Sequence, residues 1–235
     1  MEECKMKRFI ARTAALLAAA AMTASAAVSC SDKDEHDDHD HHDHQVVGED
    51  EIPDNVNIGL DDLPYGGQFK KLLPDEYDTP IGVDFDSRYL SDEEAAKIAD
   101  YFYAISEKDP EYLEKALHPD YLRYILDQTG AESAQAYLDM EYEMIKQFTG
   151  KDYSFDFVLI DDMVDNSDGT GLTGYDVTVA KAIPDGKVTA KNGFMVNCTY
   201  TAKPDDGGSY SLQARIGDYI TVCVYTIDGE PYVIF

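Results

Sequence analysis

Histidine and aspartate alternate in one short segment near the N-terminus, and these residue types could bind a metal ion. Five of the six histidines lie between residues 36 and 44, where four aspartates are interleaved with them. Imidazole nitrogens bind zinc, nickel and copper, and carboxylates can complete the coordination shell of such ions. The predicted ligands to zinc or another divalent transition metal are His36, His39, His41, His42 and His44.

The same segment has a second interpretation, an acidic solvated spacer with no role in metal binding. A low-complexity run offers no preorganised geometry, so its affinity for a metal would be modest and its selectivity poor. The clustered carboxylates favour the charged imidazolium, which would compete with metal binding as the pH falls. The sequence leaves both interpretations open.

Cys30 is the second residue with a chemical role suggested by its surroundings. Four basic residues within the first 12 precede an alanine-rich apolar run from 13 to 28, as in a secretory signal peptide. This run is too short and too rich in alanine for a stable membrane-spanning helix. Small residues at Ala27 and Ser29 stand directly before the cysteine.

The segment Ala27-Val28-Ser29-Cys30 resembles the lipobox of bacterial lipoproteins. The resemblance implies cleavage before Cys30 and attachment of a diacylglyceryl lipid to that residue. It also implies a lipid-anchored, extracytoplasmic protein of the cell envelope, held at a membrane without spanning it. Ordinary cleavage after Ala26, which leaves a free cysteine, is the alternative.

The charge of the chain limits its partners. The formal net charge is −28, and removing residues 1–29, which hold four basic and two acidic residues, leaves −30. Nucleic acid and anionic lipid surfaces both attract basic proteins, so neither is an expected electrostatic partner. The expected partners are the membrane, through lipid on Cys30, and a small ligand or an envelope protein.

Composition divides the chain into four parts. Residues 1–29 are the predicted lipoprotein signal peptide, and residues 30–62 are a predicted disordered, acidic, His-rich tether. Residues 63–90 are rich in proline and glycine and are predicted to form an extended lead-in with one edge strand. Residues 91–235 are predicted to form a single α+β domain, long enough to bury one hydrophobic core.

Capping signals and helical spacing define the first elements of this domain. They predict helices over 91–107, 110–117, 121–128 and 133–149. In the last of these helices, the predicted inner face is Tyr137, Met140, Met144 and Phe148.

The hydrophobic period then changes to two. Alternation predicts strands over 153–159, 175–179, 188–203, 210–226 and 232–235. Gly217 is the predicted site of a bulge, and Asp228-Gly229 is a strong hairpin signal. Helices followed by a meander predict an α+β fold in which N-terminal helices pack on one face of a curved antiparallel sheet.

This order of elements resembles the NTF2-like (cystatin-like) superfamily. The resemblance rests on the helix Ala95–Ser106, the Asp109-Pro110 turn, the segment Leu113–Pro119 and the C-terminal hairpin Val222–Phe235. Enzymes of that superfamily place Asp, Tyr or His inside a cone between helix and sheet. The resemblance therefore implies Tyr101, Tyr121, Tyr124, Asp100 and Asp156 as conceivable pocket residues, although core or rim packing is the better account of the tyrosines.

Three further groups of residues favour structural roles. His118 precedes Pro119 at a helix end and suits a cation near a helix C-terminus. The aspartates around Asn166 predict an Asx-rich hairpin rather than a calcium loop, because Val164 occupies the position where such a loop needs Asp. Cys198 and Cys223 are predicted to face opposite sides of the sheet, which favours two unpaired thiols over a disulfide.

The sequence contains no nucleophile elbow, zinc-protease, nucleotide-binding or dinucleotide-binding motif. It therefore favours a non-catalytic, lipid-anchored protein that binds a small ligand or a protein. One alternative is a metal-capturing lipoprotein that uses the His/Asp segment. The other is an NTF2-like enzyme, such as an isomerase or hydrolase.

Overall fold

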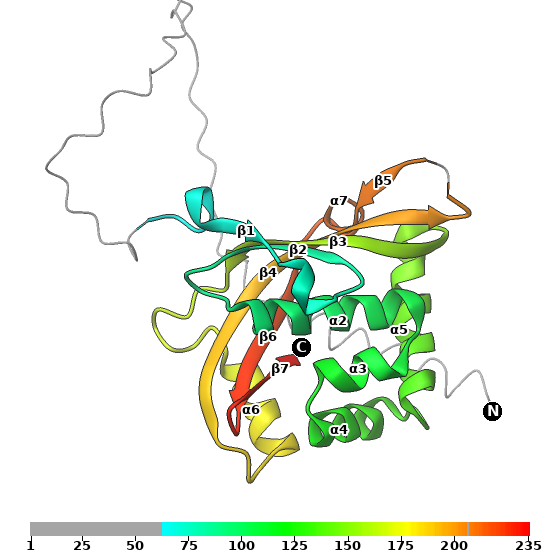
Figure 1. Ribbon diagram of the computed structural model, residues 1–235. Coiled ribbons are helices and arrows are strands. Elements are labelled where there is room, and N and C mark those ends of the chain that lie inside the picture. The colour runs from blue at the N-terminus through cyan, green and yellow to red at the C-terminus, as the bar shows by residue number, and fades with distance from the viewer. Residues whose placement is uncertain (1–62, 206) are drawn as a thin grey trace, which may run out of the picture.

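The structure is a computed structural model that describes residues 63–205 and 207–235. Cys30, the five histidines between 36 and 44 and the predicted tether lie outside the described residues. The described chain folds as one curved sheet with helices packed against it, an α+β arrangement as predicted (Figure 1).

The sheet has seven strands in the order β1-β2-β3-β4-β6-β7, with β5 paired to β4 beside this path. The strands are β1 (Lys70–Leu72), β2 (Gly82–Asp86), β3 (Asp152–Met163), β4 (Val188–Lys203), β5 (Ser209–Ser211), β6 (Ile220–Ile227) and β7 (Glu230–Ile234). All pairs are antiparallel except β2 and β3, which are parallel. The predicted fully antiparallel sheet is therefore wrong at this pair, where the long helical connection between the two strands permits the parallel direction.

The lead-in contributes two strands, β1 and β2, where the sequence predicted one. A buried ion pair between Asp86 and Arg88 fixes the start of the lead-in to the end of β2. The Asp86 carboxylate is fully buried and accepts hydrogen bonds from Gly66 N at 2.8 Å and from Arg88 Nη2 at 2.6 Å. The Arg88 guanidinium also lies over the Phe69 ring at 4.3 Å and donates to the carbonyl oxygen of Pro64 at 2.8 Å.

Four helices connect β2 to β3, close to their predicted bounds. They are α2 (Asp92–Glu107), α3 (Pro110–Ala116), α4 (Pro119–Thr129) and α5 (Ala134–Thr149). Ser91 and Glu94 form the predicted capping box of α2, and Gly130 and Gly150 end α4 and α5 in the left-handed conformation.

The predicted inner face of α5 is correct at Tyr137 and wrong at Phe148, because the helix is rotated from the predicted orientation. The structure buries Tyr137, Leu138, Tyr142 and Ile145, whereas Phe148 is 41% exposed. Both sets of residues fit a helical period, so spacing alone did not separate them. The rotation places Glu141, which is half-buried, one turn after Tyr137 and beside the buried stripe.

The predicted strand 175–179 is wrong, because this segment forms helix α6 (Thr173–Ala182). Tyr175, Val177 and Val179 alternate, but Val179 and Ile183 are buried one turn apart while Val177 is 48% exposed. Packing thus follows the helical spacing and overrides the β propensity of these residues.

The predicted strand 210–226 is also divided. Between β5 and β6 the chain forms α7 (Leu212–Ile216), and Gly217 ends this helix with φ 84° instead of forming a bulge. The predicted hairpin at Asp228-Gly229 is confirmed, since both residues have positive φ between β6 and β7.

Helices cover both faces of the sheet, so the prediction of helices on one face is incomplete. Phe155 of β3 pairs with Tyr200 of β4, and its ring contacts Phe102 of α2 with 5.7 Å between centroids. Lys191 and Gly193 lie on the other face of β4, where Lys191 contacts α6. Four successive residues of β6, from 222 to 225, are consequently buried.

Candidate functional site

His118, for which the sequence favoured a structural role, is the one histidine within the described residues, and it has a capping role. It is the N-cap of α4, where its Nδ1 accepts a hydrogen bond from Asp120 N at 3.2 Å. It also directly follows Leu117, the C-cap of α3, so the predicted place at a helix C-terminus is confirmed, and the side chain caps the next helix as well. A helix N-terminus favours hydrogen-bond acceptors, and the Nδ1 atom serves as one here.

The residues that the NTF2-like resemblance implied for a pocket do not line a common site. Tyr101 and Tyr121 are buried, and the Tyr121 hydroxyl donates to the Phe235 carbonyl oxygen at 2.6 Å. Asp156 accepts a hydrogen bond from Thr201 at 2.6 Å at the surface. Burial raises the pKa of Asp100 to about 6, although Lys97 and Lys115 lower it in part.

The space between the N-terminal helices and the sheet is occupied by aromatic side chains. Ring centroids lie 4.7 Å apart for Tyr101 and Phe235, and 4.7 Å apart for Tyr142 and Tyr153. Tyr153 also contacts Tyr200 at 6.2 Å. These contacts account for the burial of the tyrosines as core packing.

One carboxylate, Glu141, lies beside this aromatic cluster and was missed by the sequence analysis. Burial raises the pKa of Glu141 to about 7, and the neighbouring Tyr137 hydroxyl lowers it only in part. Among the described residues, the hydroxyls of Tyr137 and Tyr153 are buried without a partner in hydrogen-bond geometry. A carboxyl group that titrates near neutrality suits acid–base chemistry, but Glu141 lines neither of the two hollows described below.

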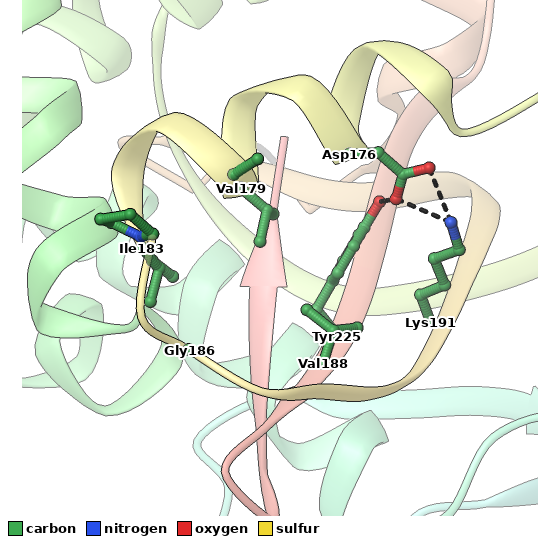
Figure 2. Close-up of a pocket in the computed structure, with 9 residues that line it drawn as sticks. Asp176, Val179, Ile183, Gly186, Val188, Lys191 and Tyr225 are labelled. Carbon is green, nitrogen blue, oxygen red and sulfur yellow. Dashed lines mark hydrogen bonds and ion pairs between the residues drawn. The ribbon is translucent and has the colours of Figure 1, made fainter.

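A surface hollow of about 280 Å³ lies instead on the other face of the sheet, between α6 and the strands β4 and β6 (Figure 2). We call it the α6 hollow. Its aliphatic walls are Val179, Ala180, Ile183, Pro184 and Val188. Gly186 closes the loop below α6, where a Cβ atom would lie 2.6 Å from Ile183.

Three polar residues form one end of the α6 hollow. Asp176 of α6 accepts hydrogen bonds from Lys191 Nζ at 2.6 and 2.8 Å and from the Tyr225 hydroxyl at 2.9 Å (Figure 2). Burial and the Asp176 carboxylate raise the pKa of Tyr225, so its hydroxyl remains a donor at neutral pH. The three groups satisfy one another and hold α6 against the sheet.

A second hollow of about 350 Å³ adjoins the first. We call it the acidic hollow, because its polar lining is Asp120, Asp185 and Asp228 with His118 and Arg123. The two hollows share Ile183, Pro184 and Gly186. They lie where the end of α6, the start of α4 and the β6–β7 turn come together.

Sequence reasoning missed both hollows because it assigned 175–179 to a strand. The helical spacing of Leu172, Tyr175, Val179 and Ile183 is the signal that could have revealed α6. No local signal pairs Asp176 with Lys191, since that contact depends on the sheet register.

The predicted Asx-rich hairpin is correct as an Asx-rich turn but wrong as a hairpin, because the turn joins β3 to the helix α6. Oδ1 of Asp165 accepts from Ser167 N at 2.9 Å, and Oδ1 of Asp168 accepts from Thr170 N at 2.8 Å. No group of three His, Cys, Asp or Glu side chains is placed to hold a metal ion within residues 63–205 and 207–235.

Cys198 and Cys223 are buried free thiols on opposite faces of the sheet, as predicted. Cys223 pairs with Gly193, and side chains alternate along β4, so the odd difference between positions 193 and 198 puts Cys198 on the other face. Burial raises the pKa of the Cys198 thiol and, with the Asp176 charge, raises that of Cys223 to about 12. Buried protonated thiols of this kind are unreactive.

No protein-family model, curated protein or solved structure matches the chain. Among the helices that the structure describes, none is long and apolar enough to cross a membrane.

Proposed function

We propose that the protein is a lipid-anchored, extracytoplasmic binding module with no catalytic activity, and that the α6 hollow is its binding site. The observation that supports this proposal is the combination of aliphatic walls with a polar end whose groups are already fixed by Asp176. Binding sites of proteins are commonly apolar hollows with a few positioned polar groups. The NTF2-like relationship and the anchor on Cys30 are parts of the same proposal.

The hollow is tested with isovaleramide, a small neutral aliphatic amide, added to the isotopically labelled chain from Ser31 to Phe235. Backbone amide signals of residues 176–188 should shift on titration. Ala180→Phe should abolish the shifts by filling the hollow, whereas Ala214→Phe on α7 should leave them intact. Both alanines are exposed, so neither change disturbs the core. Equal shifts in Ala180→Phe and the unmodified chain would exclude the α6 hollow as the binding site.

The anchor is tested by Cys30→Ala. The variant should fractionate with soluble envelope proteins, while the unmodified protein should remain with membranes. Unchanged membrane fractionation of the variant would refute lipid attachment at Cys30.

Metal capture by the histidines between 36 and 44 is the second candidate. Its basis is the density of imidazole and carboxylate ligands in that segment. Calorimetry with zinc on the chain from Ser31, with and without residues 31–45, tests it. Submicromolar binding that disappears with the deletion supports capture, and absence of heat removes the candidate.

A further inference from the structure

The two hollows beside α6 adjoin each other and form a depression in two parts. Ile183, Pro184 and Gly186 line both, so a ligand that occupies one lies directly against the other. Both are open to solvent, whereas sites for small molecules enclose most of the ligand surface. An open, two-part depression fits successive side chains of an extended segment.

The α6 hollow suits an uncharged apolar group. Val188 on its rim is 41% exposed, and Val179 and Ile183 form buried parts of its wall. Its two charged residues, Asp176 and Lys191, neutralise each other at 2.6 Å. An incoming charged group would have to break this pair, while an aliphatic side chain would only cover the apolar wall.

The acidic hollow carries uncompensated negative charge. Asp120 is paired with Arg123 at 3.0 Å, but Asp185 has no hydrogen-bond or ion-pair partner among the described residues. Asp228 accepts only the backbone amide of Lys187, at 3.2 Å. His118 also lines this hollow, and its Nδ1 is occupied by the hydrogen bond from Asp120 N at 3.2 Å. Two carboxylates therefore remain available to a cationic group.

We propose that the two hollows together bind an extended segment of a partner protein in which an aliphatic side chain is followed by a lysine or arginine. This inference rests on the proposed function and names the chemistry of its ligand. The aliphatic side chain occupies the α6 hollow, and the basic side chain lies between Asp185 and Asp228. The net charge of −28 also attracts a basic partner at long range and speeds its association.

The test uses three hexapeptides with blocked ends: Gly-Gly-Val-Lys-Gly-Gly, the same peptide with Glu in place of Lys, and the same peptide with Gly in place of Val. Each is titrated into the labelled chain from Ser31 to Phe235 at low salt. The Val-Lys peptide should shift the amide signals of residues 176–188 and 228, and should bind at least fivefold more tightly than either other peptide.

A double variant separates the local carboxylates from the overall charge. Asp185→Asn with Asp228→Asn should weaken binding of the Val-Lys peptide about fivefold, the effect of two exposed charge pairs. Asn tolerates the positive φ of Asp228, so the turn is retained. Asp127→Asn with Glu132→Gln removes the same charge from exposed positions elsewhere and should leave the affinity unchanged.

Equal affinity for the Lys and Glu peptides, or equal loss in the two double variants, would overturn the inference. If the inference is overturned but isovaleramide still shifts the amide signals of residues 176–188, the proposed function stands without the inference. If neither isovaleramide nor the Val-Lys peptide causes shifts there, the proposed function and the inference both fail.

Discussion

Replacing Glu141 by glutamine should stabilise the protein at neutral pH and should have less effect near pH 4. Burial raises the pKa of Glu141 to about 7 from an ordinary value of 4.5. Below pH 4.5 this carboxyl is protonated in both the folded and the unfolded chain. Between pH 4.5 and 7 the folded chain keeps the proton that the unfolded chain releases, so the free energy of unfolding falls as the pH rises.

The size of this loss follows from the two pKa values. Their difference corresponds to about 3 kcal/mol. Glu141 retains partial exposure, so screening by solvent reduces the expected value to about 2 kcal/mol. Glutamine has nearly the same shape and no charge at any pH, and it therefore escapes the loss.

The assay is urea unfolding of the wild type and Glu141→Gln at pH values from about 4 to about 8. The stability of the variant relative to the wild type should rise through the window from 4.5 to 7 and then level off. Glu143→Gln, an exposed change on the same helix, is the control for the general repulsion in an acidic chain. A difference that is constant with pH, or equal in the two variants, would refute the assignment of a buried titrating carboxyl.

Three further predictions concern the contacts that hold the fold together. His118→Ala should lower the free energy of unfolding by about 1 kcal/mol through loss of the α4 cap, while His118→Asn should retain most of it, as measured by urea unfolding. Arg88→Met should lower the free energy of unfolding by about 3 kcal/mol, because it leaves Asp86 buried without its ion-pair partner. Equal thermal stability of Arg88→Met and Arg88→Lys would contradict this prediction. Gly193→Ala should destabilise by about 1–3 kcal/mol because its Cβ would lie 2.7 Å from Leu172, a loss that thermal unfolding would reveal.

The sequence predicted the elements whose ends carry explicit signals. The capping box at Ser91, the proline after Asp109 and Gly150 locate helix ends through hydrogen bonds that form within a few residues. The bounds of β4 were predicted correctly, because its alternation is long and turn residues flank it. The lipid anchor and the metal ligands between 36 and 44 remain predictions.

The parts that were not predicted depend on contacts between distant segments. The helix α6 competes with a strand of similar local preference, and the outcome is set by its packing on β4 and β6. The parallel pairing of β2 with β3 joins segments separated by four helices. Glu141 was overlooked because a carboxylate is not expected in an apolar stripe, so the helix was oriented to place Met140 and Met144 inside.

The Arg88–Asp86 pair also determines where mechanical force would enter the fold. If Cys30 is anchored, tension along the N-terminal segment reaches the described structure at Leu63 and Pro64, whose carbonyl oxygens accept hydrogen bonds from Arg88. The load passes to β1 and β2 at one end of the strand order, whereas α6 packs near β6 and β7 at the other. Movement of a membrane relative to a bound partner would thus strain the sheet edge before it disturbed the two hollows.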